Sequence, residues 1–265
     1  MRKTIHWGMP TLLETNTLSE CAGICKSLGL DFIELNMNLP RYQPNKLEIS
    51  SLDYLAKKFG IYYTLHLDEN INIADFNPYV AQAYMLGVHD AITVAKSLSI
   101  PVLNMHMSKG VHFTMPNGKV FLFEAYKEQY LNNIIQFRNT CQERIGSSNV
   151  KICIENTDGF TPFQQEAIEL LLESPVFGLT FDIGHNHVIG GADEAFIRKH
   201  LSRLHHMHVH DAAGTADHLV LGTGEIELDR YLDLAEQQQC RIVLETKTVD
   251  ALWKSAQWLK DTESK

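Results

Sequence analysis

Carboxylates and imidazoles recur at the ends of short apolar segments along this chain of 265 residues. In the segment 178–183, Asp182 alternates with apolar residues, and in the segment 151–156 Glu155 stands in a similar position. Alternate residues of a β-strand face opposite ways, so the ionisable residues face away from the apolar set. Glu, Asp and His are suitable ligands for zinc, manganese or iron, and they are also common acids and bases in catalysis.

Four further segments show the same alternation. If their apolar residues face outward, the inward positions hold Thr64 and His66, Asn104 and His106, the triplet His206, His208 and His210, and Glu245. A single inward histidine is more often a hydrogen-bonded core residue than a ligand. Six such segments in succession would bury many ionisable groups in one place, which is costly unless the groups are paired or bind a cation. The pattern therefore favours a divalent-metal site at the carboxyl ends of the strands.

Eight strand-like segments alternate with helical stretches from one end of the chain to the other. The expected strands are 4–9, 31–36, 61–67, 102–107, 151–156, 178–183, 204–210 and 241–246. The expected helices are 18–28, 51–59, 78–98, 124–144, 163–173, 193–202, 229–239 and 250–260. Strands that each precede a helix imply parallel pairing, and the sequence predicts the α/β class with a single (β/α)8 TIM barrel, one domain over residues 1–265. The connection 108–123 is expected to be a loop near the active face.

Composition is ordinary for a globular protein, with 45% hydrophobic and 21% charged residues. No apolar run reaches about 18 residues and no signal-peptide core follows the first residues, so a cytoplasmic protein without a membrane span is expected. Five cysteines without a regular framework indicate reduced thiols. The formal net charge of −9 disfavours broad nucleic-acid binding, which depends on neutralising phosphates.

The polar motifs also occur in a characteristic order. They read TLH at 64–66, NMH at 104–106, IENT at 154–157, FDIGH at 181–185, MHVHD at 207–211, HLVLGTG at 218–224 and LET at 244–246. This ordered set resembles the xylose isomerase-like TIM barrel superfamily, which includes sugar phosphate isomerase/epimerase-like proteins, ketose 3-epimerases, inosose dehydratases and the endonuclease IV-type abasic-site endonucleases of AP endonuclease family 2. The motifs run from the third expected strand to the eighth.

The resemblance implies a four-ligand metal site made of Glu155, Asp182, His208 and Glu245. It implies manganese, zinc or cobalt as the divalent ion. In the epimerase-type reaction of the family, Glu155 and Glu245 would be the acid–base pair that removes and returns a proton through an enediolate. His185, one turn beyond Asp182, resembles the family's histidine that steadies a substrate oxygen and is a third catalytic candidate.

The endonuclease branch of the superfamily uses three zinc ions. His66 and His106 match its first-zinc histidines, while His185 and His218 match two ligands of the third zinc. The remaining third-zinc ligand in that branch is an aspartate, and Ala216 occupies its position here. The sequence therefore departs from the trinuclear pattern, while His66, His106 and His218 remain candidates for a second metal or for substrate.

Three more residues are candidates for substrate binding. Glu34 faces inward on the second expected strand and could bond to ligands or substrate, or make a structural contact deep in the barrel. Lys247 could meet a phosphate or an enediolate oxygen, or form a rim salt bridge. Trp7 could be a sugar-stacking platform or could simply fill the barrel.

The leading hypothesis is a metal-dependent isomerase or epimerase acting on a small ketose, polyol or sugar phosphate. The alternative is a zinc-dependent hydrolase or lyase, either an endonuclease IV-like phosphodiesterase or an inosose dehydratase-like enzyme. A binding protein that has lost turnover is a third hypothesis, and the intact glutamate pair argues against it. A small sugar-like molecule is the expected partner, and homo-oligomers through the outer helices stay open because the sequence identifies no contact face.

Overall fold

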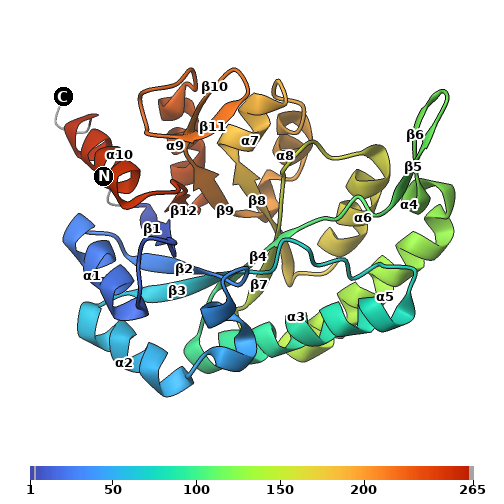
Figure 1. Ribbon diagram of the computed structural model, residues 1–265, viewed down its shortest axis with the longest axis horizontal. Helices are drawn as coiled ribbons and strands as arrows, with labels where there is room; N and C mark the ends of the chain where they lie inside the picture. The colour runs from blue at the N-terminus through green and yellow to red at the C-terminus, as the bar shows by residue number, and fades with distance from the viewer. Residues whose placement is uncertain (3, 263–265) are drawn as a thin grey trace.

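The computed structural model describes residues 1–2 and 4–262. Eight parallel strands form a closed barrel, in the order β1-β12-β9-β8-β7-β4-β3-β2 around the ring (Figure 1). Their bounds are β1 His6–Pro10, β2 Phe32–Asn36, β3 Tyr62–His66, β4 Val102–His106, β7 Lys151–Glu155, β8 Phe177–Asp182, β9 Leu204–Val209 and β12 Arg241–Leu244. The predicted (β/α)8 barrel is confirmed.

Helices surround this ring on the outside (Figure 1). They are α1 Leu18–Leu28, α2 Ile49–Phe59, α3 Pro78–Leu98, α4 Leu122–Ala125, α5 Lys127–Ile145, α6 Pro162–Leu172, α7 Ile183–Val188, α8 Glu194–Lys199, α9 Leu228–Gln238 and α10 Val249–Thr262, with short 3-10 turns η1 Pro40–Tyr42, η2 Pro44–Lys46 and η3 Leu201–Arg203. Within the described residues, no helix combines the length and apolarity that crossing a membrane would require.

Local sequence signals set where the helices begin and end. The Thr17 side chain accepts the backbone N–H of Glu20 at the start of α1, and Gly29 ends that helix with φ 74°, in the left-handed region that glycine adopts without strain. Thr161 and Gln164 form a reciprocal capping box at the start of α6. These caps fix where α1 begins and ends and where α6 begins.

Strand register brings the polar residues to one height. His106 on β4 is paired with Glu155 on β7, and Asp182 on β8 is paired with His208 on β9. In parallel strands, paired positions face the same side of the sheet, so these side chains meet inside the barrel at its carboxyl end. Apolar neighbours such as Phe181 are fully buried on the outward side, as the alternation predicts.

Two regions differ from the predicted elements. The segment expected to be a loop over 108–123 contains an antiparallel hairpin, β5 His112–Met115 and β6 Gly118–Phe121, which projects from the molecule at the upper right of Figure 1. The helix expected over 124–144 is broken at Tyr126 into α4 and α5.

The second difference lies after β8. There the short helix α7 was not predicted, the expected helix 193–202 shrinks to α8 and a 3-10 turn, and a small hairpin of β10 Asp211–Ala213 and β11 Ala216–Leu219 follows β9.

Candidate metal centre

Four ligand atoms converge at the carboxyl end of the barrel. Nδ1 of His208 lies 2.9 Å from Oε1 of Glu155 and 2.9 Å from Oε2 of Glu245. It lies 3.9 Å from Oδ2 of Asp182. One atom from each of the four residues lies within 4.8 Å of the others, so the structure brings together the four residues that the sequence singled out.

The second ring nitrogen of His208, Nε2, also lies against a carboxylate. Nε2 of His208 lies 2.8 Å from Oε1 of Glu34, while Oε2 of Glu34 accepts the Thr64 hydroxyl at 2.9 Å and lies 2.9 Å from Nε2 of His206. Burial raises the pKa of Glu34, but His208 and His206 outweigh it, so the pKa is lowered and the carboxylate is charged. A charged carboxylate only accepts, so Nε2 of His208 carries a hydrogen. Burial lowers the pKa of His208, but Glu155, Glu245 and Glu34 raise it well above its ordinary value, so Nδ1 also carries a proton in the metal-free protein, and a bound metal ion would replace that proton.

This arrangement fits a cation. A lone pair on Nδ1 would face two carboxylate oxygens at 2.9 Å, which is repulsive unless a proton or a metal ion lies between them. Oε2 of Glu245 is buried and has no hydrogen-bond partner among the described residues. A separation of about 3 Å is also what neighbouring ligand atoms have when each lies roughly 2.1 Å from one ion. The donor set of three carboxylates and one imidazole suits a divalent metal.

A second group of side chains surrounds the other oxygen of Glu155. Oε2 of Glu155 lies 3.0 Å from Nε2 of His106 and 3.4 Å from Nε2 of His66, and it accepts a hydrogen bond from the amide of Asn104. Burial raises the pKa of Glu155, yet His208 and His106 hold it well below its ordinary value. Burial lowers and Glu155 raises the pKa of His66, with a net rise to about 9. Glu155 is therefore shared by two clusters of candidate ligands.

Asp182 ends β8 and begins α7. Its Oδ1 accepts the backbone N–H of His185 at 2.7 Å, which explains why the chain turns into a helix at this point. The turn places Nδ1 of His185 3.5 Å from Oδ2 of Asp182, with no hydrogen-bond partner for that nitrogen among the described residues. His185 therefore presents an open nitrogen beside the four-ligand group.

His210 is a site residue that sequence reasoning placed inward but gave no role. Its Nδ1 lies 2.8 Å from the backbone nitrogen of His218, and its Nε2 donates to the carboxylate of Asp182 at 3.1 Å. The rings of His210 and His218 stack with centroids 4.2 Å apart. The residue in the sequence that points to the close packing of His210 is Gly184, because a Cβ at that position would lie 1.9 Å from the His210 ring.

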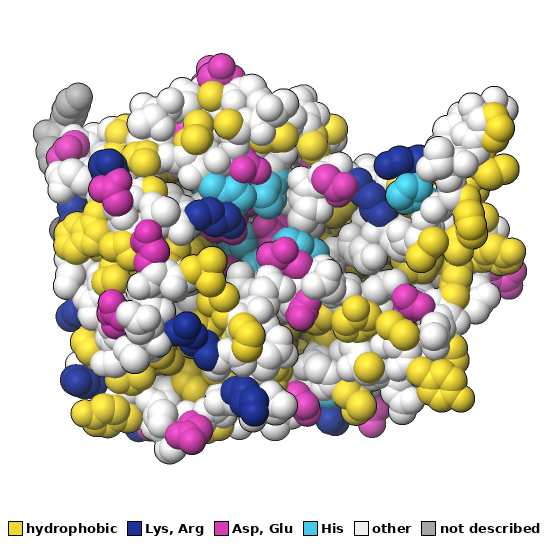
Figure 2. Space-filling view, viewed as in Figure 1, with side chains coloured by type: hydrophobic (Ala, Val, Ile, Leu, Met, Phe, Trp, Pro, Cys, Tyr) yellow, Lys and Arg dark blue, Asp and Glu magenta, His cyan; other side chains and the backbone are white. Residues whose placement is uncertain are grey.

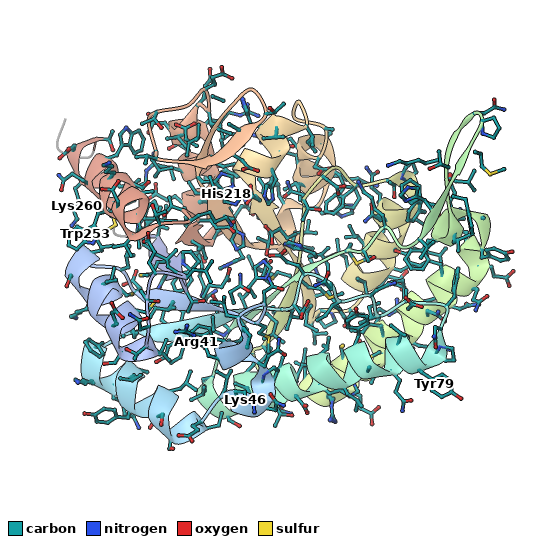
Figure 3. The ribbon with its side chains drawn as sticks, in the orientation of Figure 1. Arg41, Lys46, Tyr79, His218, Trp253 and Lys260 are labelled. Carbon is teal, nitrogen blue, oxygen red and sulfur yellow. The ribbon has the colours of Figure 1, made fainter. Side chains whose placement is uncertain are left out.

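Two candidates lie at the rim of the site. Nε2 of His218 lies 3.6 Å from Oε1 of Glu245, and Nζ of Lys247 lies 2.9 Å from the same oxygen. The Lys247 side chain is 60% exposed. Figure 2 shows imidazoles and carboxylates gathered in a hollow of this face, and Figure 3 labels His218 in the same part of the view.

The structure does not bring Trp7 to this site. Trp7 is the second residue of β1, is 2% exposed, and its indole donates to the backbone carbonyl of Arg2. It therefore packs near the amino end of its strand, where it cannot stack on a molecule at the opposite end. Glu34 is 1% exposed, and its contacts with His206 and His208 are of the structural kind that the sequence offered as one of two alternatives.

Comparisons with known proteins agree with the barrel. An uncharacterised protein of Methanocaldococcus jannaschii is 26% identical over 226 residues, which cover 80% of this chain and 74% of that protein. A solved structure of a D-tagatose 3-epimerase-like protein has a TM-score of 0.78 at 24% identity, covering 98% of this chain and 97% of that one. A structure of the IolI protein with a bound zinc atom has a TM-score of 0.74 at 15% identity, covering 98% of each chain.

At these identities the solved structures show a shared fold. The family described as xylose isomerase-like TIM barrel matches residues 23–262, which is most of the chain. The chain therefore belongs to the xylose isomerase-like TIM barrel family.

Proposed function

We propose that this protein is a metal-dependent isomerase or epimerase acting on a small ketose, polyol or sugar phosphate. The observation that carries the proposal is the placing of two glutamates, Glu155 and Glu245, each 2.9 Å from Nδ1 of His208. The similar structures of a D-tagatose 3-epimerase-like protein and of a zinc-bound IolI protein support it.

A divalent manganese, zinc or cobalt ion bound by Glu155, Asp182, His208 and Glu245 would polarise two adjacent substrate oxygens and stabilise the negative charge that develops between them. The protein's own part is proton transfer. Burial raises the pKa of both glutamates, but the charged His208 ring has the larger opposite effect and holds both pKa values well below the ordinary value, so both carboxylates are charged at neutral pH and can accept a proton. One would remove the proton next to the substrate carbonyl to give an enediolate, and the other would return it.

His185 and Lys247, which lie beside the four candidate metal ligands, would orient the substrate. The open Nδ1 of His185 is available to a substrate hydroxyl beside the metal ligands. Burial lowers the pKa of Lys247, but the carboxylate of Glu245 raises it above its ordinary value, so this ammonium is charged at neutral pH. Lys247 would therefore meet a phosphate or a developing oxyanion at the mouth of the barrel.

Solvent exchange tests the proposal directly. The metal-loaded protein, incubated in deuterated water with a panel of ketoses, should incorporate deuterium at the carbon next to the carbonyl of one sugar. Glu245→Gln should slow that exchange by about 10²–10⁴-fold, the usual contribution of a general acid or base. Glu227→Gln, at an exposed carboxylate before α9, is the matched control. Absence of exchange with every ketose would contradict the proposal.

A zinc-dependent hydrolase or lyase is the second candidate. It is favoured by the histidine pair His66 and His106, which lies against the far oxygen of Glu155 and would be unnecessary for one metal. Metal analysis after gentle purification separates the two. One weakly held ion per chain supports epimerisation, whereas two or more tightly held zinc ions support hydrolysis of a phosphodiester or loss of water from a cyclic polyol.

A further inference from the structure

The amino end of the barrel, opposite the metal centre, gathers three cationic side chains from neighbouring strands. Lys151 begins β7 and Arg241 begins β12, while Arg203 ends η3 directly before β9. The strands β12, β9, β8 and β7 are consecutive neighbours in the parallel ring, so their amino ends lie at the same end of the barrel. Such a group stands out in a chain whose formal net charge is −9.

The protein does not neutralise these charges. Nζ of Lys151 donates to the backbone carbonyl of Pro175 at 2.6 Å, and Nη2 of Arg203 donates to that of Phe177 at 2.9 Å. Within the described residues, no carboxylate forms an ion pair with Lys151, Arg203 or Arg241. The two side chains are therefore held in place by uncharged groups, and their positive charges stay uncompensated.

Two guanidinium groups also keep hydrogen-bond donors without an acceptor. Cζ of Arg241 lies 6.0 Å from the centre of the Tyr62 ring. Nε of Arg241 and Nε of Arg203 are buried and have no hydrogen-bond partner among the described residues. Asp31 lies at the same end, but its carboxylate accepts the backbone N–H of Trp7. Because a buried donor without an acceptor is costly, this end of the barrel suits a ligand that brings acceptors.

His205 lies among the three cations. A Cβ at Gly178 would lie 2.5 Å from Cδ2 of His205 and 2.9 Å from the backbone oxygen of Arg203, so glycine at this position of β8 leaves room for the imidazole. Burial lowers the pKa of His205, and the charges of Lys151, Arg203 and Arg241 lower it further, to about 4. At neutral pH the ring is therefore uncharged and can donate one N–H.

A phosphate group matches this chemistry. Three uncompensated positive charges favour a ligand with more than one negative charge, and a phosphomonoester carries about 1.5 to 2 at neutral pH. Guanidinium groups donate in pairs to phosphate oxygens, and an ammonium adds a point charge. Lys151, Arg203, His205 and Arg241 are all partly exposed, so a ligand can approach them from solvent.

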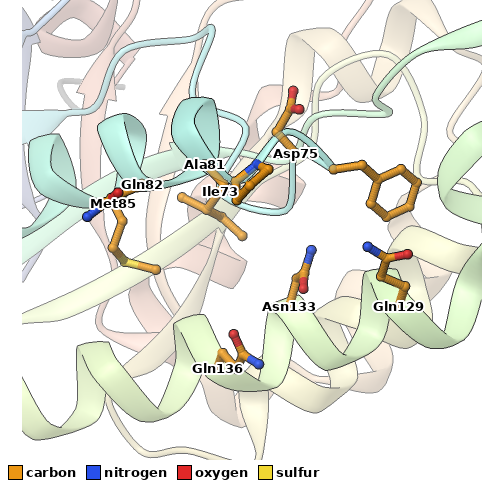
Figure 4. Close-up of a pocket in the computed structure, with 10 residues that line it drawn as sticks. Ile73, Asp75, Ala81, Gln82, Met85, Gln129, Asn133 and Gln136 are labelled. Carbon is orange, nitrogen blue, oxygen red and sulfur yellow. The ribbon is translucent and has the colours of Figure 1, made fainter.

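The cleft between α3 and α5 has the opposite character. Its volume is about 380 Å³, and Figure 4 shows Asp75 and the side-chain amides of Gln82 and Asn133 in its walls. No lysine or arginine is among the described residues that line it. Because a carboxylate repels a dianion, this cleft does not compete for the same ligand.

We propose that the amino end of the barrel binds a phosphate group, with Lys151, Arg203 and Arg241 as its contacts. The ligand is either inorganic phosphate or the phosphate of a phosphorylated metabolite. Lys151 and Arg241 stand four positions before Glu155 and Glu245, which corresponds to about 13 Å along a strand. The site is therefore separate from the metal centre and independent of the reaction performed there.

Titration calorimetry of the purified full chain with inorganic phosphate, at constant ionic strength in chloride, tests the proposal. One saturable site is expected, and Lys151→Gln and Arg241→Gln should each weaken it by about tenfold or more, the effect of losing a hydrogen bond to a charged group. Lys96→Gln is the matched control, because it removes the same charge and its Nζ also donates to a backbone carbonyl, at 2.7 Å. That variant should bind phosphate as tightly as the wild type.

Lys151 stands at the partly exposed start of β7, so Lys151→Gln leaves the apolar core intact and carries the test if Arg241→Gln does not fold. A wild type without saturable binding, or an unchanged affinity in Lys151→Gln, would overturn the proposal. Binding that is lost in Lys247→Gln and kept in Lys151→Gln would place the phosphate at the barrel mouth instead.

Glycerol phosphate identifies the source of the phosphate group. It has no carbonyl group, so it cannot enter the proposed reaction at the metal centre. Binding tighter than that of inorganic phosphate, with the same loss in Lys151→Gln, assigns the site to a phosphorylated metabolite, whereas weaker binding with that loss assigns it to free phosphate. Equal affinities of Lys151→Gln and the wild type for both probes would contradict the site.

Discussion

Nε2 of His208 lies 2.8 Å from Oε1 of Glu34, although 174 positions separate the two residues in the chain. The contact joins the second strand of the barrel to the seventh across its interior. It fixes a hydrogen on Nε2 and turns Nδ1 toward Glu155 and Glu245, where a proton or a metal ion would lie between them. A buried carboxylate thus orients His208, one of the four candidate metal ligands.

Glu34→Gln should therefore weaken metal binding although it changes none of the four candidate metal ligands. The amide is uncharged and can turn its NH2 toward Nε2, so the imidazole loses the partner that fixes its hydrogen. Affinity for manganese or zinc, measured by competition with a chelator, should fall by about 10–100-fold. Glu48→Gln, at an exposed carboxylate before α2, should leave the affinity unchanged. Equal affinities for Glu34→Gln and the wild type would contradict this account of His208.

The metal-free protein should lose stability as the pH rises above neutrality. Burial lowers but Glu155 raises the pKa of His66, to about 9 from an ordinary 6.5, so the folded state holds this proton more tightly than the unfolded state. The resulting stabilisation is complete below pH 6.5 and is lost as the pH rises through 9, to an extent of roughly 3 kcal/mol at most. Urea unfolding of the chelator-treated protein at intervals across this range measures it.

Saturating metal should reverse that trend. Metal binding requires deprotonated imidazoles, so the increase in stability that manganese or zinc provides should grow from pH 6.5 to 9. His66→Gln should reduce the pH dependence of the metal-free protein, and His210, whose pKa burial lowers but Asp182 raises to about 9, accounts for part of what remains. A free energy of unfolding that stays level or rises over this range without metal would show that His66 is not held as an imidazolium by Glu155.

Gly184→Ala should disturb the link between Asp182 and His218. The added Cβ would lie 1.9 Å from the buried ring of His210, so the ring or the start of α7 has to shift. Overpacking of this kind should cost about 1–3 kcal/mol in urea unfolding. Gly23→Ala in α1 is the control, because a Cβ there meets nothing within 4 Å and alanine is the better helix former by up to about 1 kcal/mol. Equal effects of the two substitutions would contradict the packing argument.

Alternation along single strands carried most of what the sequence could predict. Asp182 and Glu155 stand among apolar neighbours whose outward packing fixes which way the carboxylates face, and the order of strands fixes their common end. That argument needs only local sequence and the closure of the barrel. It therefore predicted the fold, and it predicted which side chains the structure gathers at the mouth.

Contacts that depend on register or on loop geometry were beyond this reasoning. The pairing of His210 with Asp182 follows a register shift between β8 and β9 near Thr180. No pattern of residues in the sequence predicts that shift. The sequence also left open whether Trp7 stacks on a sugar or fills the barrel, because its position near the amino end of β1 is visible only once the strand bounds are known.

The hairpin β5–β6 was taken for a loop. Its glycine and proline content indicates a turn, while the strand pairing appears only in the ladder from His112 to Phe121. The alternation of Phe113 and Met115 with Thr114 was present in the sequence, but two four-residue strands are too short for periodicity to separate them from a loop.

The most direct test of the central claim is anomalous diffraction from crystals of the wild-type protein soaked in manganese or zinc. The strongest anomalous peak should lie among Glu155, Asp182, His208 and Glu245, at about 2.0–2.3 Å from one atom of each, and it should be missing from crystals of Asp182→Asn. Ions bound only elsewhere on the chain, with no ion shared by these four side chains, would contradict the account.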